Sequence, residues 1–437
     1  MTSIYRIAAF ENLESLLSED RDSVLHFVSS RSPFATLIRA NVSEENIRSL
    51  DLSEREPLFF NDRDILLSNP EILRSMKKEA DAVLLGNRSS RELEKIIAEL
   101  DLSLVSVKAD VREQFEDKCF FHDFLLRKGL PCPRGSIIAE LSQLSQEEFY
   151  PGVLQVSQSQ SGVGTYFVGS PDESERLVTE NELEFPLLLR KFVHGAPYGV
   201  TVLCGHGQVL VSAVRRQCSL RIANREIFCG VQWIPKSDLS LSEASLLERA
   251  VIQLGGALRD EGFLGVANVD FMLTEEGPLF LECNPRLSGA TWQLAQEPAL
   301  FHGLSFLKEY SSVFLSSGPS CSRLHLPESS FRGSTFDFDF MLLGQPDSVF
   351  PRRGLRTAGV YQFGSTEVQF LGEDLELLEV PRSFLLLPGA LPGESLSLEC
   401  GLGIALSDFP LYKILPERAL LNKYGVMLKE EIAKDLL

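Results

Sequence analysis

Four polar residues with short, regular spacing could bind a metal ion and an acidic substrate: Asp270, Glu282, Asn284 and Arg286. Carboxylate and amide oxygens are ligands that Mg²⁺ and Mn²⁺ accept in proteins. Because Mg²⁺ keeps waters and is usually completed by substrate phosphates, the expected ligand is a metal–nucleotide complex. The planar guanidinium of Arg286 suits two oxygens of a carboxylate or an acyl phosphate.

These residues come together if the chain around them forms a β-hairpin. We predict its turn at residues 275–277 (Glu-Glu-Gly), because Gly tolerates the positive φ of a three-residue hairpin loop. With Thr274 and Pro278 flanking the turn, Asp270 lies directly opposite Glu282, and the alternation of side chains places the four polar residues on one face. The opposite face is apolar and consists of Val269, Phe271, Leu281 and Cys283.

Two facing carboxylates indicate a bound cation. Like charges directly opposite each other destabilise a sheet, and burial disfavours each charge further. A single acidic residue on a strand ordinarily belongs to the solvent-exposed face. Here four polar groups share one face and the opposite face is apolar, so we predict a site for a divalent metal ion.

Several predicted elements would have to position this hairpin. Residues 1–110 alternate strand-like and helical patterns, which is typical of a small α/β unit. Residues 111–135 predict one helix that stops at a Gly and a Pro. Residues 150–169 predict a strand, a Ser/Gln/Gly loop and a second strand, and residues 186–195 predict a buried strand. From about residue 319, short apolar runs between Gly, Ser and Pro clusters predict a mostly β segment.

Composition limits the classes of partner. The 437 residues are 44% hydrophobic and 24% charged, which is typical of a globular protein with a large core. The net charge of -19 disfavours nucleic acid and anionic membranes as partners. Without a long apolar run or the features of a signal peptide, we expect a cytoplasmic protein. The 8 cysteines form no C-x-x-C pair and the 6 histidines are dispersed, which favours reduced thiols and no zinc site.

From about residue 111 to residue 310, the chain resembles the ATP-grasp superfamily. The hairpin NVDFMLTEEGPLFLECNPR has the spacing of that family's two acidic metal ligands, ligand Asn and Arg, and EDKCFFHDFLLRKGLPCPRG resembles the helix that opens its core. The resemblance implies an α/β fold with four parts: a small N-terminal α/β domain, two α+β subdomains that clasp ATP, and a mostly β C-terminal domain. The expected boundaries are 1–110, 111–195, 196–318 and 319–437.

The resemblance also assigns roles to single residues. Asp270, Glu282 and Asn284 would bind Mg²⁺ or Mn²⁺, and Arg286 would contact the reacting acyl phosphate as the catalytic residue. The residues expected to bind ATP are Lys118 through its ammonium group, Gly162 and Gly164 in a glycine-rich loop, and Lys191, Phe192 and Val193 through their backbone at the adenine edge.

One position departs from the family pattern. The strand before the glycine-rich loop usually carries a second phosphate-binding Lys, and here that position is Gln155, which can donate a hydrogen bond but has no charge. Arg215 or Arg216 on a later strand could compensate. After the hairpin, Ser288 and Gly289 start a predicted helix whose free N–H groups could bind the substrate carboxylate, although an ordinary helix cap is an equal alternative.

The activity implied by the resemblance is an ADP-forming carboxylate–amine ligase. Such an enzyme activates a carboxylate, here an amino acid or small peptide, as an acyl phosphate and joins it to an amine. The expected partners are these small molecules, and the resemblance suggests a homodimer. Two alternatives stay open: loading of an amino acid onto a carrier-protein thiol by the same chemistry, and a non-catalytic ATP-binding sensor, which Gln155 favours. No motif identifies the substrates or the role of residues 319–437.

Overall fold

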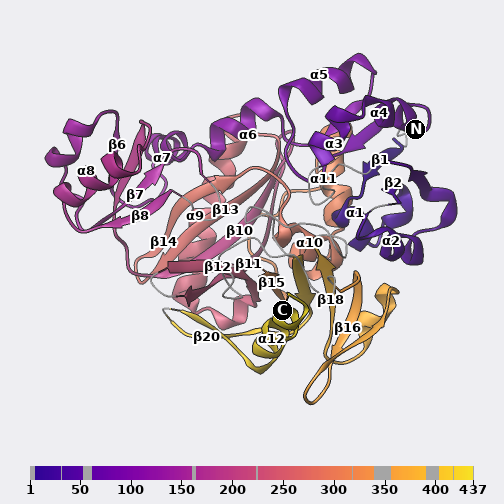
Figure 1. Cartoon of the computed structure of the whole chain (residues 1–437). Helices are drawn as coiled ribbons and strands as arrows, with labels where there is room; N and C mark the ends of the chain where they lie inside the picture. Colours follow the sequence, from indigo (N-terminus) through magenta and orange to yellow (C-terminus); the bar gives the residue numbers. More distant parts are fainter. Residues whose placement is uncertain are drawn as a thin grey trace.

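A computed structural model describes residues 5–30, 32–52, 62–159, 164–222, 225–316, 318–338, 356–389, 403–416 and 418–436. Three sheets carry the fold, with the largest in the middle of the molecule and the two smaller ones towards opposite ends of the view in Figure 1. The predicted α/β architecture is confirmed. The domain boundaries proposed at residues 110, 195 and 318 stay predictions.

The N-terminal sheet is parallel, with strand order β3-β2-β1-β4-β5. Buried side chains of the strands pack against helices that follow them in the sequence. The strands are β1 (Ile7–Phe10), β2 (Val24–Ser29), β3 (Ile47–Leu50), β4 (Ala82–Leu84) and β5 (Ser103–Val105). The helices are α1 (Leu13–Leu17), α2 (Ala35–Asn41), α3 (Asp62–Ser68), α4 (Pro70–Lys77) and α5 (Arg91–Glu99).

The single helix predicted for residues 111–135 is wrong, because two helices, α6 (Ala109–Glu116) and α7 (Lys118–Arg127), occupy this segment. Asp117 separates them: its backbone is extended, and its side chain accepts a hydrogen bond from the Phe120 N–H at 2.8 Å. An Asp at this position caps the second helix. The break places Lys118 at the first position of α7, where its side chain is buried.

The second sheet has the order β6-β9-β7-β8 and is antiparallel. Leucines of β9 and β7 and the helix α8 form its small apolar core. The elements are β6 (Gly135–Ile138), β7 (Gly152–Val156), β8 (Thr165–Val168), α8 (Pro171–Glu180) and β9 (Leu187–Lys191).

The third sheet joins strands from before and after residue 318 in the order β14-β13-β10-β11-β12-β15-β19-β18-β16-β17. The mostly β segment therefore extends the central sheet through the pair Gln232–Ser334. The strands are β10 (Ala196–Cys204), β11 (Val209–Ile222), β12 (Arg225–Ile234), β13 (Gly265–Thr274), β14 (Gly277–Asn284), β15 (Ser334–Phe338), β16 (Gly359–Phe363), β17 (Val368–Gly372), β18 (Ser383–Pro388) and β19 (Gly403–Ser407).

Four helices and a small hairpin accompany this sheet. The long helix α9 buries Leu247, Val251, Leu254 and Leu258 in the largest core, as its amphipathic pattern predicts. The elements are α9 (Leu241–Asp260), α10 (Gly289–Gln296), α11 (Phe306–Leu315), β20 (Tyr412–Ile414), β21 (Ala419–Leu421) and α12 (Lys423–Leu436). Over the described ranges, no helix is long and apolar enough to cross a membrane, and seven cysteines are free.

Candidate active site

The hairpin of β13 and β14 places Asp270 directly opposite Glu282, as the sequence predicts. The predicted turn is wrong, because Thr274 pairs with Gly277 and the turn has two residues rather than three. A β-bulge restores the register: Phe271 pairs with Phe280 and Asp270 with Glu282, which leaves Leu281 as the extra residue.

The bulge also changes the apolar face of the hairpin. Phe280, which is 0% exposed, packs against Phe271 at a ring-centroid distance of 6.1 Å. Leu281, which the strict alternation places on this face, is only half-buried. The correction has a physical cause, since a bulge shifts the alternation of one strand by one residue.

Asp270 lies against a buried arginine. A Cβ on Gly199 would lie 2.9 Å from the Asp270 Oδ1 and 3.1 Å from the Arg215 Cζ, so the two side chains use the space that this glycine leaves free. Burial, and then the negative charge of Glu282, raise the pKa of the Asp270 carboxyl well above its usual range, while Arg215 opposes that shift. An uncompensated pair of carboxylates is therefore unfavourable here, and a divalent cation between them would relieve the repulsion.

The oxygen atoms present fit Mg²⁺. Asp270 and Glu282 provide two facing carboxylates, and the Asn284 side chain lies beside Glu282, with its Nδ2 at 3.4 Å from the Glu282 Oε1. Among the described residues, no group of three or more His, Cys, Asp or Glu side chains could hold a metal ion. Two carboxylates and an amide leave positions for water and phosphate oxygens, which is typical of Mg²⁺ bound with a nucleotide.

Lys118 reaches this site from the start of α7. Its Nζ lies 3.6 Å from the Glu282 Oε2 and donates a hydrogen bond to the Ser159 carbonyl at 2.9 Å. The side chain is 4% exposed, so its charge acts in a partly desolvated environment. The structure thus brings the predicted phosphate-binding lysine next to the predicted metal ligands.

A second buried cation was missed in the sequence. Arg190 of β9 is 3% exposed, and it donates hydrogen bonds to the Gln155 Oε1 at 2.5 Å and to the Leu281 carbonyl at 2.9 Å. Burial lowers the pKa of Arg190 to about 10, and the negative charge of Glu282 opposes that shift. Arg190 therefore supplies a positive charge beside the uncharged Gln155.

The two arginines expected to compensate for Gln155 have other partners. Arg215 donates a hydrogen bond to the Thr201 hydroxyl at 3.0 Å, and Arg216 donates to the Pro416 carbonyl at 3.3 Å and lies over the Tyr198 ring. The sequence signal for Arg190 was an arginine within the leucine run LLLRK, since a buried strand rarely holds a charge without a partner.

Some of the backbone groups predicted to contact the adenine are already hydrogen-bonded within the protein, and only one of the two predicted loop glycines is described. The Lys191 N–H donates to the Arg134 carbonyl and the Phe192 N–H to the Pro151 carbonyl, so both are used within the sheet. Among the described contacts, the Val193 N–H has no such acceptor. Gly164, with a φ of 76°, closes the turn before β8. Gly162 lies outside the described residues.

Arg286 belongs to a cluster of three arginines around one carboxylate. Its Nε lies 3.0 Å from the Glu116 Oε1, which also accepts from Arg88 at 3.2 Å, while Arg112 lies 2.7 Å from the Glu116 Oε2. Burial and the positive charge of Arg286 lower the pKa of Arg88. Arg112 also lies 3.2 Å from the Glu113 Oε1, so three guanidinium groups face two carboxylates, and the remaining positive charge favours an anion.

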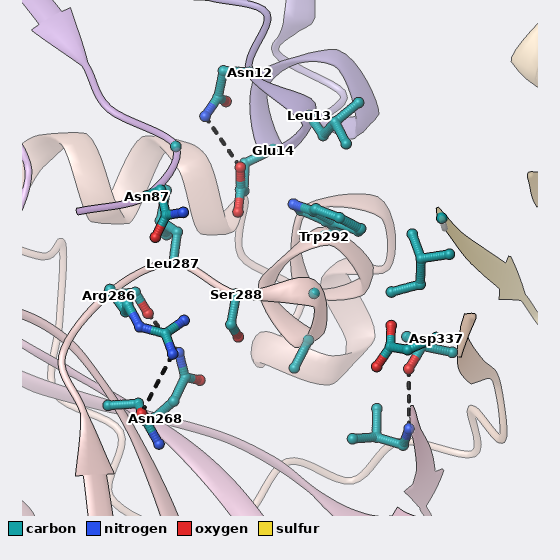
Figure 2. A pocket seen from close by; sticks show the side chains of 18 of the residues that line it. Asn12, Leu13, Glu14, Asn87, Asn268, Arg286, Leu287, Ser288, Trp292 and Asp337 are labelled. Atoms are coloured by element: carbon teal, nitrogen blue, oxygen red, sulfur yellow. Dashed lines mark hydrogen bonds between the residues drawn. The ribbon is translucent and has the colours of Figure 1, made fainter. Parts of the chain in front are cut away.

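A cavity of about 550 Å³ adjoins these groups, between the N-terminal strands, the metal-site hairpin and β15. Arg286 and Ser288 lie on its wall, and Figure 2 shows Trp292 above Ser288 and Asp337 on the far side of the view from Arg286. Ser288 and Gly289 form the start of α10, so the first N–H groups of this helix lie at the cavity. The two predicted substrate residues therefore line the cavity together with Arg286.

Comparisons with known proteins indicate the family and the fold of the chain. Residues 115–290 match the sequence model of an ATP-grasp domain. The carbamoyl phosphate synthase large chain of Thermotoga neapolitana is 26% identical over 263 residues, which are 57% of this chain and 23% of that protein. The arginine-specific large chain of Geobacillus stearothermophilus is 23% identical over 246 residues, or 55% of this chain and 23% of that protein. The chain thus spans about a quarter of these relatives.

Solved structures share the fold over nearly the whole chain. A biotin carboxylase from Campylobacter jejuni, solved as a β-γ-ATP complex, has a TM-score of 0.64 at 15% identity and covers 99% of this chain and 92% of its own. Phosphoribosylamine–glycine ligase from Thermotoga maritima has a TM-score of 0.58 at 12% identity and covers 98% of this chain and 96% of its own.

Proposed function

Because residues 115–290 form an ATP-grasp domain, we propose that this protein is an ATP-dependent ligase that activates a carboxylate as an acyl phosphate and joins it to an amine. In this reaction a carboxylate oxygen attacks the γ-phosphorus of ATP and ADP leaves. The amine nitrogen then attacks the carbonyl carbon, and phosphate leaves. Both substrates are small molecules under this proposal.

The observation that carries the proposal is the pairing of Asp270 with Glu282 beside a cavity whose wall near Asp270 holds Arg215 and Arg286. Asp270, Glu282 and Asn284 would hold Mg²⁺, which neutralises phosphate charge when it is bound. Lys118 and Arg190 would face the phosphates from the other side of Glu282. Phosphoryl transfer depends on positioning and charge neutralisation, so no protein nucleophile is needed.

Arg286 would bind the carboxylate and then the acyl phosphate. Glu116 holds its Nε, which leaves part of the guanidinium fork for the substrate. The Asn268 side chain donates to the Arg286 carbonyl at 2.7 Å and fixes the backbone at this point. Arg88 and Arg286 share the carboxylate of Glu116, and the positive charge left over makes this wall of the cavity attractive for an anion.

A direct test measures phosphate release from ATP with a panel of amino acids and simple carboxylates, with hydroxylamine as a trap for acyl phosphates. We expect at least one carboxylate to give Mg²⁺-dependent phosphate and hydroxamate in equal amounts. The Asp270→Asn variant should lose both products, and the exposed Asp408→Asn variant should keep them. Tight MgATP binding without product formation for any carboxylate would contradict the ligase and favour a sensor.

The sensor alternative rested on the missing positive charge at Gln155. Arg190 lies within hydrogen-bonding distance of that side chain, which removes the reason for expecting weak phosphate binding. For the carrier-protein alternative, no observation in the described residues favours a thiol over an amine as the second substrate.

A further inference from the structure

We infer that the cavity binds a primary ammonium group at Asp337, so that one substrate of the proposed ligase is an amine held by this carboxylate. This inference rests on the proposed function and adds a second recognition site to it. Asp337 is part of β15, in the mostly β segment that carried no readable motif.

The position of Asp337 on its strand directs it to the cavity. Phe336 is buried in the core beneath β15, with 0% exposure, whereas its neighbours Thr335 and Asp337 line the cavity, as does the edge of Phe338 at the end of the strand. Figure 2 shows the Asp337 carboxylate directed towards the space beside Ser288. Alternation of side chains along the strand therefore presents a carboxylate to a ligand.

Asp337 lacks partners of the kind that satisfy Glu14 and Asp62 in the same cavity. Glu14 accepts from the Thr291 hydroxyl at 2.7 Å and from Asn12 at 3.1 Å, and Asp62 accepts from the Gly86 N–H at 2.6 Å. Over the part of the chain that the structure describes, no hydrogen bond or ion pair reaches the Asp337 carboxylate. Burial alone raises the pKa of Asp337 to about 7, without a contribution from any charged neighbour.

A half-buried carboxylate without a partner is partly desolvated and unfavourable, and a ligand cation would compensate for it. The remaining wall limits what that ligand can be. Apolar side chains form much of the lining, among them Leu13, Phe34, Phe228, Trp292 and Ile404. Arg215 and Arg286 lie at the metal end of the cavity. A molecule with an ammonium group, an apolar body and a carboxylate matches the three surfaces.

The ammonium group has two possible sources with the same chemistry. It is either the amino group of the amino acid whose carboxylate is activated, or the amine that later attacks the acyl phosphate. Both place a charge-assisted hydrogen bond on Asp337, and such a bond contributes about tenfold or more to affinity.

The binding test compares each of the twenty amino acids with its des-amino acid, for example phenylalanine with 3-phenylpropionate, by titration calorimetry of the full chain with MgADP. We expect at least one amino acid to bind about tenfold or more tightly than its des-amino form. Asp337→Asn should remove this preference and leave des-amino binding within about twofold. Asp337→Glu, which keeps the charge, should retain part of it, and Asp408→Asn should behave as the wild type.

Several results would overturn the inference: no panel compound binds, the preference is absent in the wild type, or Asp337→Asn weakens both forms equally. A thermal melt of each variant separates unfolding from lost recognition. If no carboxylate gives phosphate while an Asp337-dependent preference persists, the proposed ligase fails and the ammonium site stands. If phosphate forms with equal KM values in wild type and Asp337→Asn for all substrates, the ligase stands and the site fails.

The hydroxylamine assay identifies the source of the ammonium group. If Asp337 binds the activated amino acid, Asp337→Asn raises the KM of that amino acid for hydroxamate formation. If Asp337 binds the attacking amine, hydroxamate formation is unchanged and only the KM of the amine in the coupled reaction rises. Each pattern supports the site and assigns it to one substrate.

Discussion

Replacing Arg190 tests whether this residue supplies the positive charge that Gln155 lacks. The guanidinium donates to the Gln155 Oε1 at 2.5 Å and to the Leu281 carbonyl at 2.9 Å, and its pKa of about 10 keeps it charged at neutral pH. A charged hydrogen bond to a phosphate contributes about 1.5–3 kcal/mol, so Arg190→Met should weaken MgADP binding by roughly 10- to 150-fold.

The same substitution has a separate effect on stability. Removing the guanidinium leaves the Leu281 carbonyl of the bulge without its donor, at a cost of about 1–3 kcal/mol. Calorimetric titration with MgADP and urea unfolding therefore measure the two effects independently. Arg190→Lys should keep the charge and retain part of the nucleotide affinity. It lacks the planar guanidinium that donates two hydrogen bonds at once, so the retention should be incomplete.

A rescue variant tests whether the lost MgADP affinity comes from the missing positive charge. Adding Gln155→Lys to Arg190→Met returns a cation to the neighbouring strand, and the double variant should regain most of the lost MgADP affinity. Gln155→Lys alone should be less stable than the wild type, because it places two cations side by side. Unchanged MgADP affinity in Arg190→Met, with a folded protein, would refute the role of Arg190.

Three further predictions concern the rest of the site. Arg286→Ala should lower turnover about tenfold or more and leave the Kd of MgADP nearly unchanged, whereas parallel losses in both would contradict its role at the acyl phosphate. Gly199→Ala should weaken Mg²⁺-dependent nucleotide binding, because the new Cβ would lie 2.9 Å from the Asp270 Oδ1; wild-type binding would show that this space is not needed. Burial raises the pKa of Glu14 from 4.5 to about 8, so the folded state binds this proton more tightly than the unfolded state does. The charge of Asp62 adds to the shift, and hydrogen bonds from Thr291 and Asn12 oppose it. The contribution of Glu14 to stability should fall as pH rises from about 4.5 to about 8, by at most about 1.4 kcal/mol per pH unit, and urea unfolding of Glu14→Gln should show a flatter pH profile than the wild type.

The hairpin illustrates what local sequence can predict. The opposition of Asp270 and Glu282 followed from the expected turn, and their shared face from strand alternation, both of which depend on close neighbours in the sequence. The turn was predicted one residue too long, and the bulge at Leu281 compensated for that difference. The carbonyl of the bulged residue Leu281 accepts a hydrogen bond from Arg190, which belongs to another sheet. The sequence of the hairpin alone does not contain that information.

The substrate side of the site could not be predicted in the same way. Glu116 and Arg88 contact each other only because the N-terminal loop after β4 packs against α6. Asp337 comes from β15, which pairs with β12 in the central sheet although 99 residues separate the two strands in the sequence. These contacts arise from tertiary packing, and no periodicity or motif marks the residues that take part.

Charge distribution links the site to the kind of ligand it can admit. The chain carries a net charge of -19, yet six cationic side chains lie around four carboxylates at the site: Lys118, Arg88, Arg112, Arg190, Arg215 and Arg286 around Asp270, Glu282, Glu116 and Glu113. A long polyanion such as nucleic acid would meet the acidic surface along most of its length. A nucleotide is short enough to lie within the locally positive region, where the low dielectric strengthens its attraction. The acidic exterior and the cations grouped around the metal-site hairpin together favour a small, highly charged anion over a long one.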